Sequence, residues 1–185
     1  MVTLDQETFV GPWAGLPVAW SEEDTFDEDT FRRDVMRCCE AGIPGVYSGG
    51  TSGEFYAMEQ EEFRQVTRTM VETCHATDTP AMVGCTSTYT GGAVLRARWA
   101  AEIGADAIQV ALPFWMEVAE EEVVPFFRDI SRATGGRRQR ADARRGGKAQ
   151  AGRGAFTPFG DWPLCTAVPH YGATTRPAAG RGQAE

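Results

Sequence analysis

Residues 49–54, with the sequence Gly-Gly-Thr-Ser-Gly-Glu, form the segment of this chain that is best suited to chemistry. They follow a short apolar run at residues 43–47 and precede a helical pattern that starts at Met58. Where a strand ends in glycines and hydroxyls and then enters a helix, backbone N–H groups and small side chains can surround an anion near the positive end of the helix dipole. The same residue types also serve simply as a helix N-cap with glycines in a tight turn, which is the competing interpretation. The residues expected to bind an anion here are Thr51, Ser52 and Gly53.

Lysine is almost absent from the chain. Residues 1–136 contain none, and the only lysine in the 185-residue sequence is Lys148. Chemistry that depends on a side-chain amine therefore has a single candidate, which lies far from the glycine-rich loop in the sequence.

Charge divides the chain into two parts. Residues 1–136 carry 23 Asp and Glu against 9 Arg, whereas residues 137–185 carry 9 Arg and Lys against 3 acidic residues. The net charge thus changes from −14 to +6 near Gly136, within a total of −8. Such a reversal predicts a boundary, with residues 1–136 as one domain and residues 137–185 as a separate tail.

Cysteine and histidine usage argues against a metal site. The 5 cysteines form no Cys-x-x-Cys pair, and His75 and His170 are not spaced to act as ligands with them. We expect no metal and no cofactor. The odd number of cysteines and the lack of a secretory leader predict a reduced, cytoplasmic setting. No apolar run approaches the ~20 residues needed to cross a bilayer, so no membrane contact is expected.

The first 136 residues alternate between strand and helix patterns. Apolar runs predict strands at residues 12–19, around Val46, at residues 80–85 and at residues 106–112. Helices are predicted by apolar stripes at Phe31, Val35 and Cys38, at Phe63, Val66 and Met70, over residues 93–103, and at Val123, Phe126, Phe127 and Ile130. Asp27 is the expected N-cap of the first helix, and Pro125 is compatible with the last helix only in its first turn.

Four β-α units in succession imply a parallel sheet covered by helices, which is an α/β fold. A complete (β/α)₈ barrel needs about 250 residues, so four units make about half of one. A small doubly wound sheet is the other architecture compatible with this pattern.

Residues 137–185 lack the composition of a folded core. Of these 49 residues, 30 are Ala, Gly, Pro or Arg, and the only branched aliphatic residues are Leu164 and Val168. The tail is therefore predicted to be irregular and disordered. A basic arm for nucleic acid is one interpretation. We favour a slip of the reading frame near Gly136, which would give an unrelated tail, and we expect no nucleic-acid partner.

Several ordered motifs of the first 136 residues resemble one enzyme family. The loop at residues 50–54, the strand ending in Gly84, the Gly-Ala-Asp-Ala sequence at residues 104–107 and Pro-Phe-Trp at residues 113–115 follow the order and spacing of the dihydrodipicolinate synthase / N-acetylneuraminate lyase family. The resemblance covers about three quarters of the chain and ends at the predicted boundary. It implies a truncated (β/α)₈ TIM barrel made of about the first four βα units.

The resemblance also implies an activity, which is lyase or synthase chemistry on a 2-oxo acid of the pyruvate type. In the family a lysine on strand six forms an imine with the ketone, and a tyrosine on strand five relays protons. Thr51 matches a hydroxyl of that relay, and Ser52 matches the residue whose backbone N–H binds the substrate carboxylate. Intact members of the family form homo-oligomers.

Two departures from the family pattern define what is expected of this chain. Phe114 and Trp115 stand where the family often has two tyrosines, and Trp115 cannot relay a proton because its indole only donates. Trp115 is instead expected to form a wall of an apolar substrate pocket, as in a sugar-acid or aromatic-substrate lyase. A packed aromatic side chain at a strand end is the competing interpretation.

The greater departure is the loss of the strands that would carry the imine lysine and the relay tyrosine. Lys148 lies among glycines and arginines of the tail and is not expected to be the nucleophile. We therefore predict little or no activity for this chain. The alternative is a non-catalytic α/β module that binds a carboxylate or phosphate at the Thr51–Gly53 loop.

Overall fold

The computed structural model describes Leu4 and residues 9–116 and 118–135. Within these residues the chain passes four times from a strand to a helix. The strands are β1 (Ala14–Gly15), β2 (Val46–Ser48), β3 (Ala81–Gly84) and β4 (Ala107–Gln109). The helices are α1 (Glu28–Glu40), α2 (Gln60–His75), α3 (Thr90–Glu102) and α4 (Glu120–Ala133).

The four strands form one parallel sheet in the order β1-β2-β3-β4. Val46 is paired with Ala81 and Val83 with Ile108, so neighbouring strands are held in a continuous parallel register. The order follows the sequence without a reversal, as in consecutive units of a (β/α)₈ barrel. A doubly wound sheet reverses its strand order at a switch point, and the described sheet has none. The predicted truncated barrel is therefore confirmed as the fold.

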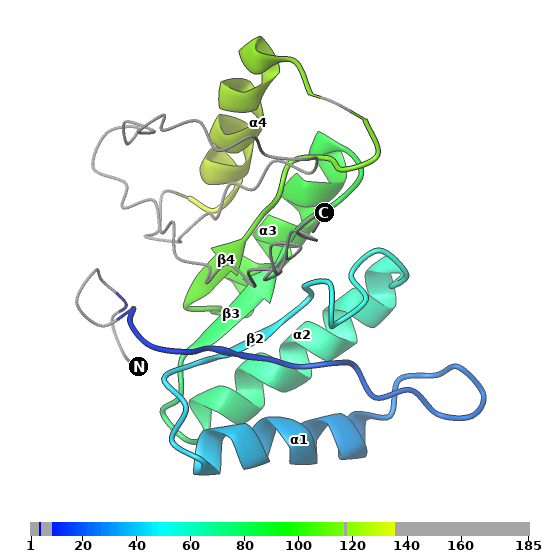
Figure 1. Ribbon diagram of the computed structural model, residues 1–185, viewed down its shortest axis with the longest axis vertical. Helices are drawn as coiled ribbons and strands as arrows, with labels where there is room; N and C mark the ends of the chain where they lie inside the picture. The colour runs from blue at the N-terminus through cyan, green and yellow to red at the C-terminus, as the bar shows by residue number, and fades with distance from the viewer. Residues whose placement is uncertain (1–3, 5–8, 117, 136–185) are drawn as a thin grey trace, which may run out of the picture.

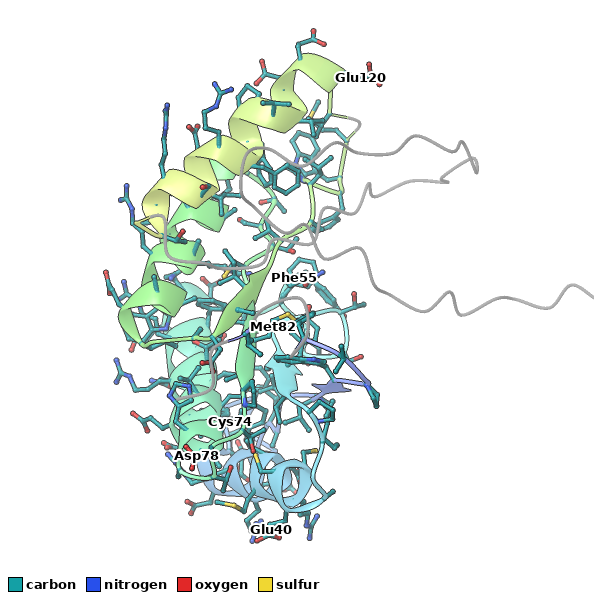
Figure 2. All side chains as sticks on the ribbon, turned by 90° about the vertical axis from the view of Figure 1, so that its left-hand side faces the viewer. Glu40, Phe55, Cys74, Asp78, Met82 and Glu120 are labelled. Atoms are coloured by element: carbon teal, nitrogen blue, oxygen red, sulfur yellow. The ribbon has the colours of Figure 1, made fainter. Side chains whose placement is uncertain are left out.

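The helices cover one side of the sheet. Figure 1 shows α1 and α2 side by side along one half of the molecule and α3 and α4 along the other, in agreement with the packing of each pair. In Figure 2, α2, α3 and α4 lie to the left of the sheet, and α1 lies below it. The helix-facing side of the sheet carries the fully buried side chains of Val46 on β2, Val83 on β3 and Val110 directly after β4.

Alternation along the strands separates this core from the opposite face. On β2, Val46 and Ser48 are buried and Tyr47 is half-buried, and on β3, Val83 is buried while Met82 is half-buried. Since successive side chains of a strand point to opposite faces, Tyr47 and Met82 lie on the face away from the helices. In a barrel this face is the interior.

The first two helices begin and end as their sequences require. The Asp27 carboxylate accepts the Thr30 N–H at 3.0 Å, which confirms the predicted N-cap of α1. This bond is the main reason why the pKa of Asp27 lies below its usual value. The chain leaves α1 through Gly42, whose φ of +71° favours glycine. Helix α2 starts differently, with a reciprocal capping box between Glu59 and Glu62.

Four details of the predicted elements were wrong. Cys39, not Cys38, is the buried cysteine of α1, because it follows Phe31 and Val35 on the core-facing stripe. Helix α3 begins at Thr90, three residues earlier than predicted, and includes two glycines of its first turn. Strand β4 is shorter than predicted, since only Ala107–Gln109 pair with β3.

The fourth detail concerns Pro125, which lies one turn inside α4 rather than in its first turn. The proline removes the hydrogen bond to the Glu121 carbonyl, and both residues are exposed, so water can satisfy that oxygen. The predicted tail at residues 137–185 lies outside the described residues. No helix in the described part of the chain is long and apolar enough to cross a membrane.

Candidate functional site

The predicted anion loop follows β2 and forms a series of tight turns. The Gly53 N–H donates to the Gly50 carbonyl at 3.1 Å, and the Glu54 N–H donates to the Thr51 carbonyl at 3.2 Å. Thr51 and Ser52 are exposed at the tip of the loop, whereas Gly53 is buried beneath them. The structure therefore presents two exposed hydroxyl-bearing residues on a hydrogen-bonded turn.

The loop does not lead directly into α2, and this corrects one part of the prediction. Helix α2 begins at Gln60, and the Glu59 side chain caps its first turn. The positive end of this helix is thus occupied by a carboxylate of the chain itself. Thr51 and Ser52 are not its N-cap either, so that part of the competing interpretation is wrong, whereas the glycines do stand in a tight turn.

Two glycines allow the ends of β2 and β3 to touch. A Cβ on Gly49 would lie 2.7 Å from the Gly84 carbonyl oxygen, and Gly49 has a φ of +78°. Any other residue at either position would push the two strand ends apart. The contact explains why glycines stand at both positions and brings the loops after β2 and β3 together.

The loop is held on its β1 side by a glutamate. The Trp20 indole donates to the Glu54 carboxylate at 3.0 Å, which joins residues 34 positions apart in the sequence. Glu54 itself has a φ of +52°, in the left-handed region that non-glycine residues rarely adopt. The Trp20 bond therefore helps to maintain a strained turn directly after Gly53.

Three aromatic side chains connect the loop after β2 to the loop after β4, and we call them the aromatic wall: Phe55, Phe114 and Trp115. The rings of Phe55 and Phe114 meet edge to face with centroids 5.6 Å apart. The Trp115 indole donates to the Thr88 carbonyl at 2.8 Å, and 65% of the side chain remains exposed. The structure thus joins the segment after β2 to the loop after β4 through Phe55 and Phe114, and it fixes Trp115 against the loop after β3.

A polar pair on the inner face of the sheet was not predicted from the sequence. The Tyr47 hydroxyl donates to the Gln109 side-chain carbonyl across β3. The same hydroxyl packs against Gly50, where a Cβ would collide with it. The alternation along β2 was the available signal. Because Val46 faces the helices, the next residue, Tyr47, points toward the barrel interior.

Ser48 is a second residue that sequence reasoning missed. It is the last residue of β2, it is 1% exposed, and its hydroxyl has no hydrogen-bond partner in the described part of the chain. A Cβ on Gly53 would lie 3.3 Å from this oxygen, so Ser48 lies directly beneath the loop.

At the opposite end of the sheet His75 forms a structural pair. Its Nε2 lies 2.9 Å from the Asp106 carboxylate, which also accepts the Ala81 N–H at 2.9 Å. His75 therefore links the end of α2 to the start of β4. Across the described residues no cluster of three metal-ligating side chains occurs.

The sequence pattern of the Dihydrodipicolinate synthetase family matches residues 9–137. This match spans more than half of the chain and all four βα units. The chain belongs to this family. The membership agrees with the order of the four strands and with the position of the glycine-rich loop after β2.

Two curated relatives illustrate the range of the dihydrodipicolinate synthetase family. A 4-hydroxy-tetrahydrodipicolinate synthase of Methanothrix thermoacetophila is 29% identical over 126 residues, which cover 68% of this chain and 42% of that protein. A trans-O-hydroxybenzylidenepyruvate hydratase-aldolase of Pseudomonas putida is 30% identical over 137 residues, covering 70% of this chain and 41% of that protein. The chain therefore spans less than half the length of these relatives.

Solved structures show the same fold for this half. A sialic acid aldolase of Ruminococcus gnavus, a catalytic lysine mutant, superposes with a TM-score of 0.69 at 19% identity and covers 74% of this chain and 45% of that one. YagE of E. coli K12, in complex with pyruvate, superposes with a TM-score of 0.64 at 20% identity and covers 73% of this chain and 44% of that one. The four βα units thus match under half of each neighbour.

Proposed function

We propose that this member of the lyase and synthase family binds the carboxylate of a pyruvate-type 2-oxo acid at the loop of Thr51, Ser52 and Gly53. The observation that carries the proposal is the fixed turn, which exposes two hydroxyl residues while it buries Gly53 between strand ends. In this proposal the Thr51 hydroxyl holds the carboxylate and joins the proton relay, and the Ser52 N–H also binds the carboxylate. The complex of YagE with pyruvate supports the choice of ligand class.

We further propose that this chain forms no imine with that ligand. Leu4 and residues 9–116 and 118–135 contain no lysine, and Lys148 lies outside the described residues. Imine formation needs an amine of lowered pKa held beside the ketone. The loop would then bind the substrate without the nucleophile that starts the reaction.

Reduction with borohydride tests this directly. We expect no mass adduct after incubation with pyruvate and borohydride, as measured on the intact chain and on its peptides. An adduct that maps to Lys148 would contradict the proposal. An adduct at the N-terminal amine would be a non-specific control, because it would also form after the chain is unfolded in urea.

The aromatic wall supports a more specific ligand, namely a 2-oxo acid that carries an aryl group. Phe114 and Trp115 are 45% and 65% exposed, and the Thr88 bond fixes the Trp115 indole. A hydratase-aldolase among the relatives acts, by its name, on a benzylidenepyruvate. Stacking on such a wall favours aromatic groups.

Binding to paired ligands tests the wall. We expect benzylidenepyruvate to bind more tightly than pyruvate, and Trp115→Ala to remove about 1 kcal/mol of that preference while pyruvate binding stays unchanged. Trp13→Phe is the matched control, because Trp13 directly precedes β1, whereas the site loops follow the strands. Equal loss of both ligands in Trp115→Ala would refute the wall and leave the loop proposal intact.

The second candidate function is a non-catalytic module that binds any carboxylate or phosphate at the same loop. Competition between pyruvate and inorganic phosphate separates the two, since a surviving 2-oxo acid site should prefer pyruvate. Equal affinity for phosphate would favour the module.

We also propose a reduced, cytoplasmic setting and self-association. The first rests on Cys38, Cys39, Cys74 and Cys85, all of which are free thiols. The second rests on the exposed aromatic side chains at the strand ends, which another copy of the chain would cover. Light scattering on the purified chain, before and after Trp115→Ala, measures the self-association.

A further inference from the structure

A single arginine on α3 is buried beneath the loops of the site. The other buried residues of this helix are Gly92, Ala93, Ala97 and Ala100, whose small side chains let the helix approach the sheet. Arg96 shares this face and is only 9% exposed. A long, charged side chain is unusual among the glycines and alanines of a buried helix face. Its hydrogen bonds explain its presence there.

The Arg96 guanidinium donates to three backbone carbonyls from two different loops. It bonds to the Phe55 oxygen at 3.0 Å and the Met58 oxygen at 3.3 Å, both in the segment between β2 and α2. It also bonds to the Thr86 oxygen at 2.7 Å, directly after β3. The planar fork of arginine, with five donors, is suited to joining several acceptors at once.

Burial of this charge is unfavourable, and the surroundings offset it only with dipoles. Burial lowers the pKa of Arg96 from its usual value. The guanidinium lies over the Phe63 ring at 4.8 Å, and within the described residues no salt bridge involves it. A buried charge needs polar partners, which here are the three carbonyls and the face of the Phe63 ring.

The carbonyl of Phe55 connects Arg96 to the anion loop. The N–H of Phe55 donates back to the Gly50 carbonyl at 3.4 Å, so one peptide segment faces Arg96 on one side and the start of the loop on the other. Glu54, the preceding residue, is held from the β1 side by Trp20. The loop is thus fixed from both sides by side chains more than 30 positions away in the sequence.

We propose that Arg96 is a positioning residue for the ligand site. By holding the carbonyls of Phe55, Met58 and Thr86 together, it keeps Thr51 and Ser52 in the geometry that binds a carboxylate. This inference rests on the proposed function for the identity of the ligand, but the ordering of the loop is independent of it.

Two variants and a control test the inference. Arg96→Met keeps most of the buried length and removes all three bonds, whereas Arg96→Lys keeps the charge and fewer donors. Arg68→Met is the control, because Arg68 lies on α2 over the Trp99 ring at 4.8 Å and contacts none of the three carbonyls. Each protein is examined by hydrogen exchange of the Gly53, Glu54, Phe55 and Ala57 amides and by calorimetric titration with pyruvate.

We expect Arg96→Met to speed exchange of the loop amides by about tenfold or more relative to the amides of α1, and to weaken pyruvate binding by a similar factor. Arg96→Lys should lie between this variant and the wild type, and Arg68→Met should match the wild type. If Arg96→Met does not fold, Arg96→Lys decides the question by the same two readouts.

Unchanged loop exchange and unchanged binding in both Arg96 variants would overturn the inference. Faster exchange spread evenly over the whole chain would overturn it as well, because that result shows a general loss of stability. If the wild-type chain binds no pyruvate, the proposed function fails, and the loop-specific exchange still decides the role of Arg96.

Discussion

The helix-covered side of the sheet and the site at the strand ends are built by different forces. On the helix side, Val46, Val83 and Val110 are fully buried among other aliphatic side chains. At the strand ends, the site consists of exposed hydroxyl and aromatic residues held by a few long-range hydrogen bonds. Burial of apolar area is non-directional and tolerant, whereas a site needs atoms at set positions. The comparison teaches that stability and binding reside in separate groups of residues, which mutations can separate.

The largest effect is expected from the helix side. Phe31 of α1 is fully buried. Replacing it with alanine removes a large apolar side chain and leaves a cavity, so Phe31→Ala should lower the free energy of unfolding by about 3–5 kcal/mol. Urea denaturation measures the change. A loss below about 1 kcal/mol would mean that this core is loosely packed.

The contact between Gly49 and Gly84 lies where the sheet meets the site loops, and its disruption should cause a smaller loss of stability. A Cβ on Gly84 would collide with the Gly49 backbone, so Gly84→Ala should cost about 1–3 kcal/mol and displace the loop. Gly42→Ala is the matched control, since Gly42 has a φ of +71° with no atom near a new Cβ. It should lose only about 1 kcal/mol and leave ligand binding unchanged.

The loop tip should show the opposite behaviour. Thr51→Val removes an exposed hydroxyl and keeps the shape of the side chain, so its free energy of unfolding should change by no more than about 0.5 kcal/mol. Pyruvate binding should weaken by about tenfold, because a hydrogen bond to a charged ligand is lost. Wild-type affinity in this variant would remove Thr51 from the site.

The smallest effect is expected at the N-cap of α1 and depends on pH. The pKa of Asp27 is lowered in the folded state by the Thr30 N–H, so its carboxylate stabilises the fold above the unfolded pKa of about 4. This contribution is lost as the pH falls through the lower folded pKa. Asp27→Asn should therefore be less stable than the wild type at pH 7, and thermal unfolding should show the gap narrowing as the pH falls below about 4.

Regular periodicity made the helix side predictable. The stripe of Phe63, Val66 and Met70 predicted α2, and all three side chains are fully buried. The parallel sheet and the placement of the glycine-rich loop followed from four β-α units in sequence, whereas the strand order followed from the family resemblance, because a doubly wound sheet fits the same pattern. These features depend on local spacing, which a sequence displays directly.

The supports of the site were not predictable in the same way. Arg96 and Glu54 act through partners 41 and 34 positions away, and neither spacing marks them as neighbours. Likewise, α2 begins only after Glu59, which caps the helix and separates the loop from the helix dipole. The sequence did not show at which residue the loop ends and the helix begins. Long-range hydrogen bonds are set by the fold, so they become visible only with the structure.

The central claim is that the Thr51–Gly53 loop binds the carboxylate of a 2-oxo acid. The most direct measurement is an NMR titration of the ¹⁵N-labelled chain with pyruvate, followed at the amides of residues 50–55. The account predicts saturable shifts centred on Ser52 and Gly53, with much weaker shifts from the same concentration of phosphate. Shifts that fall elsewhere, or that phosphate reproduces in full, would contradict it.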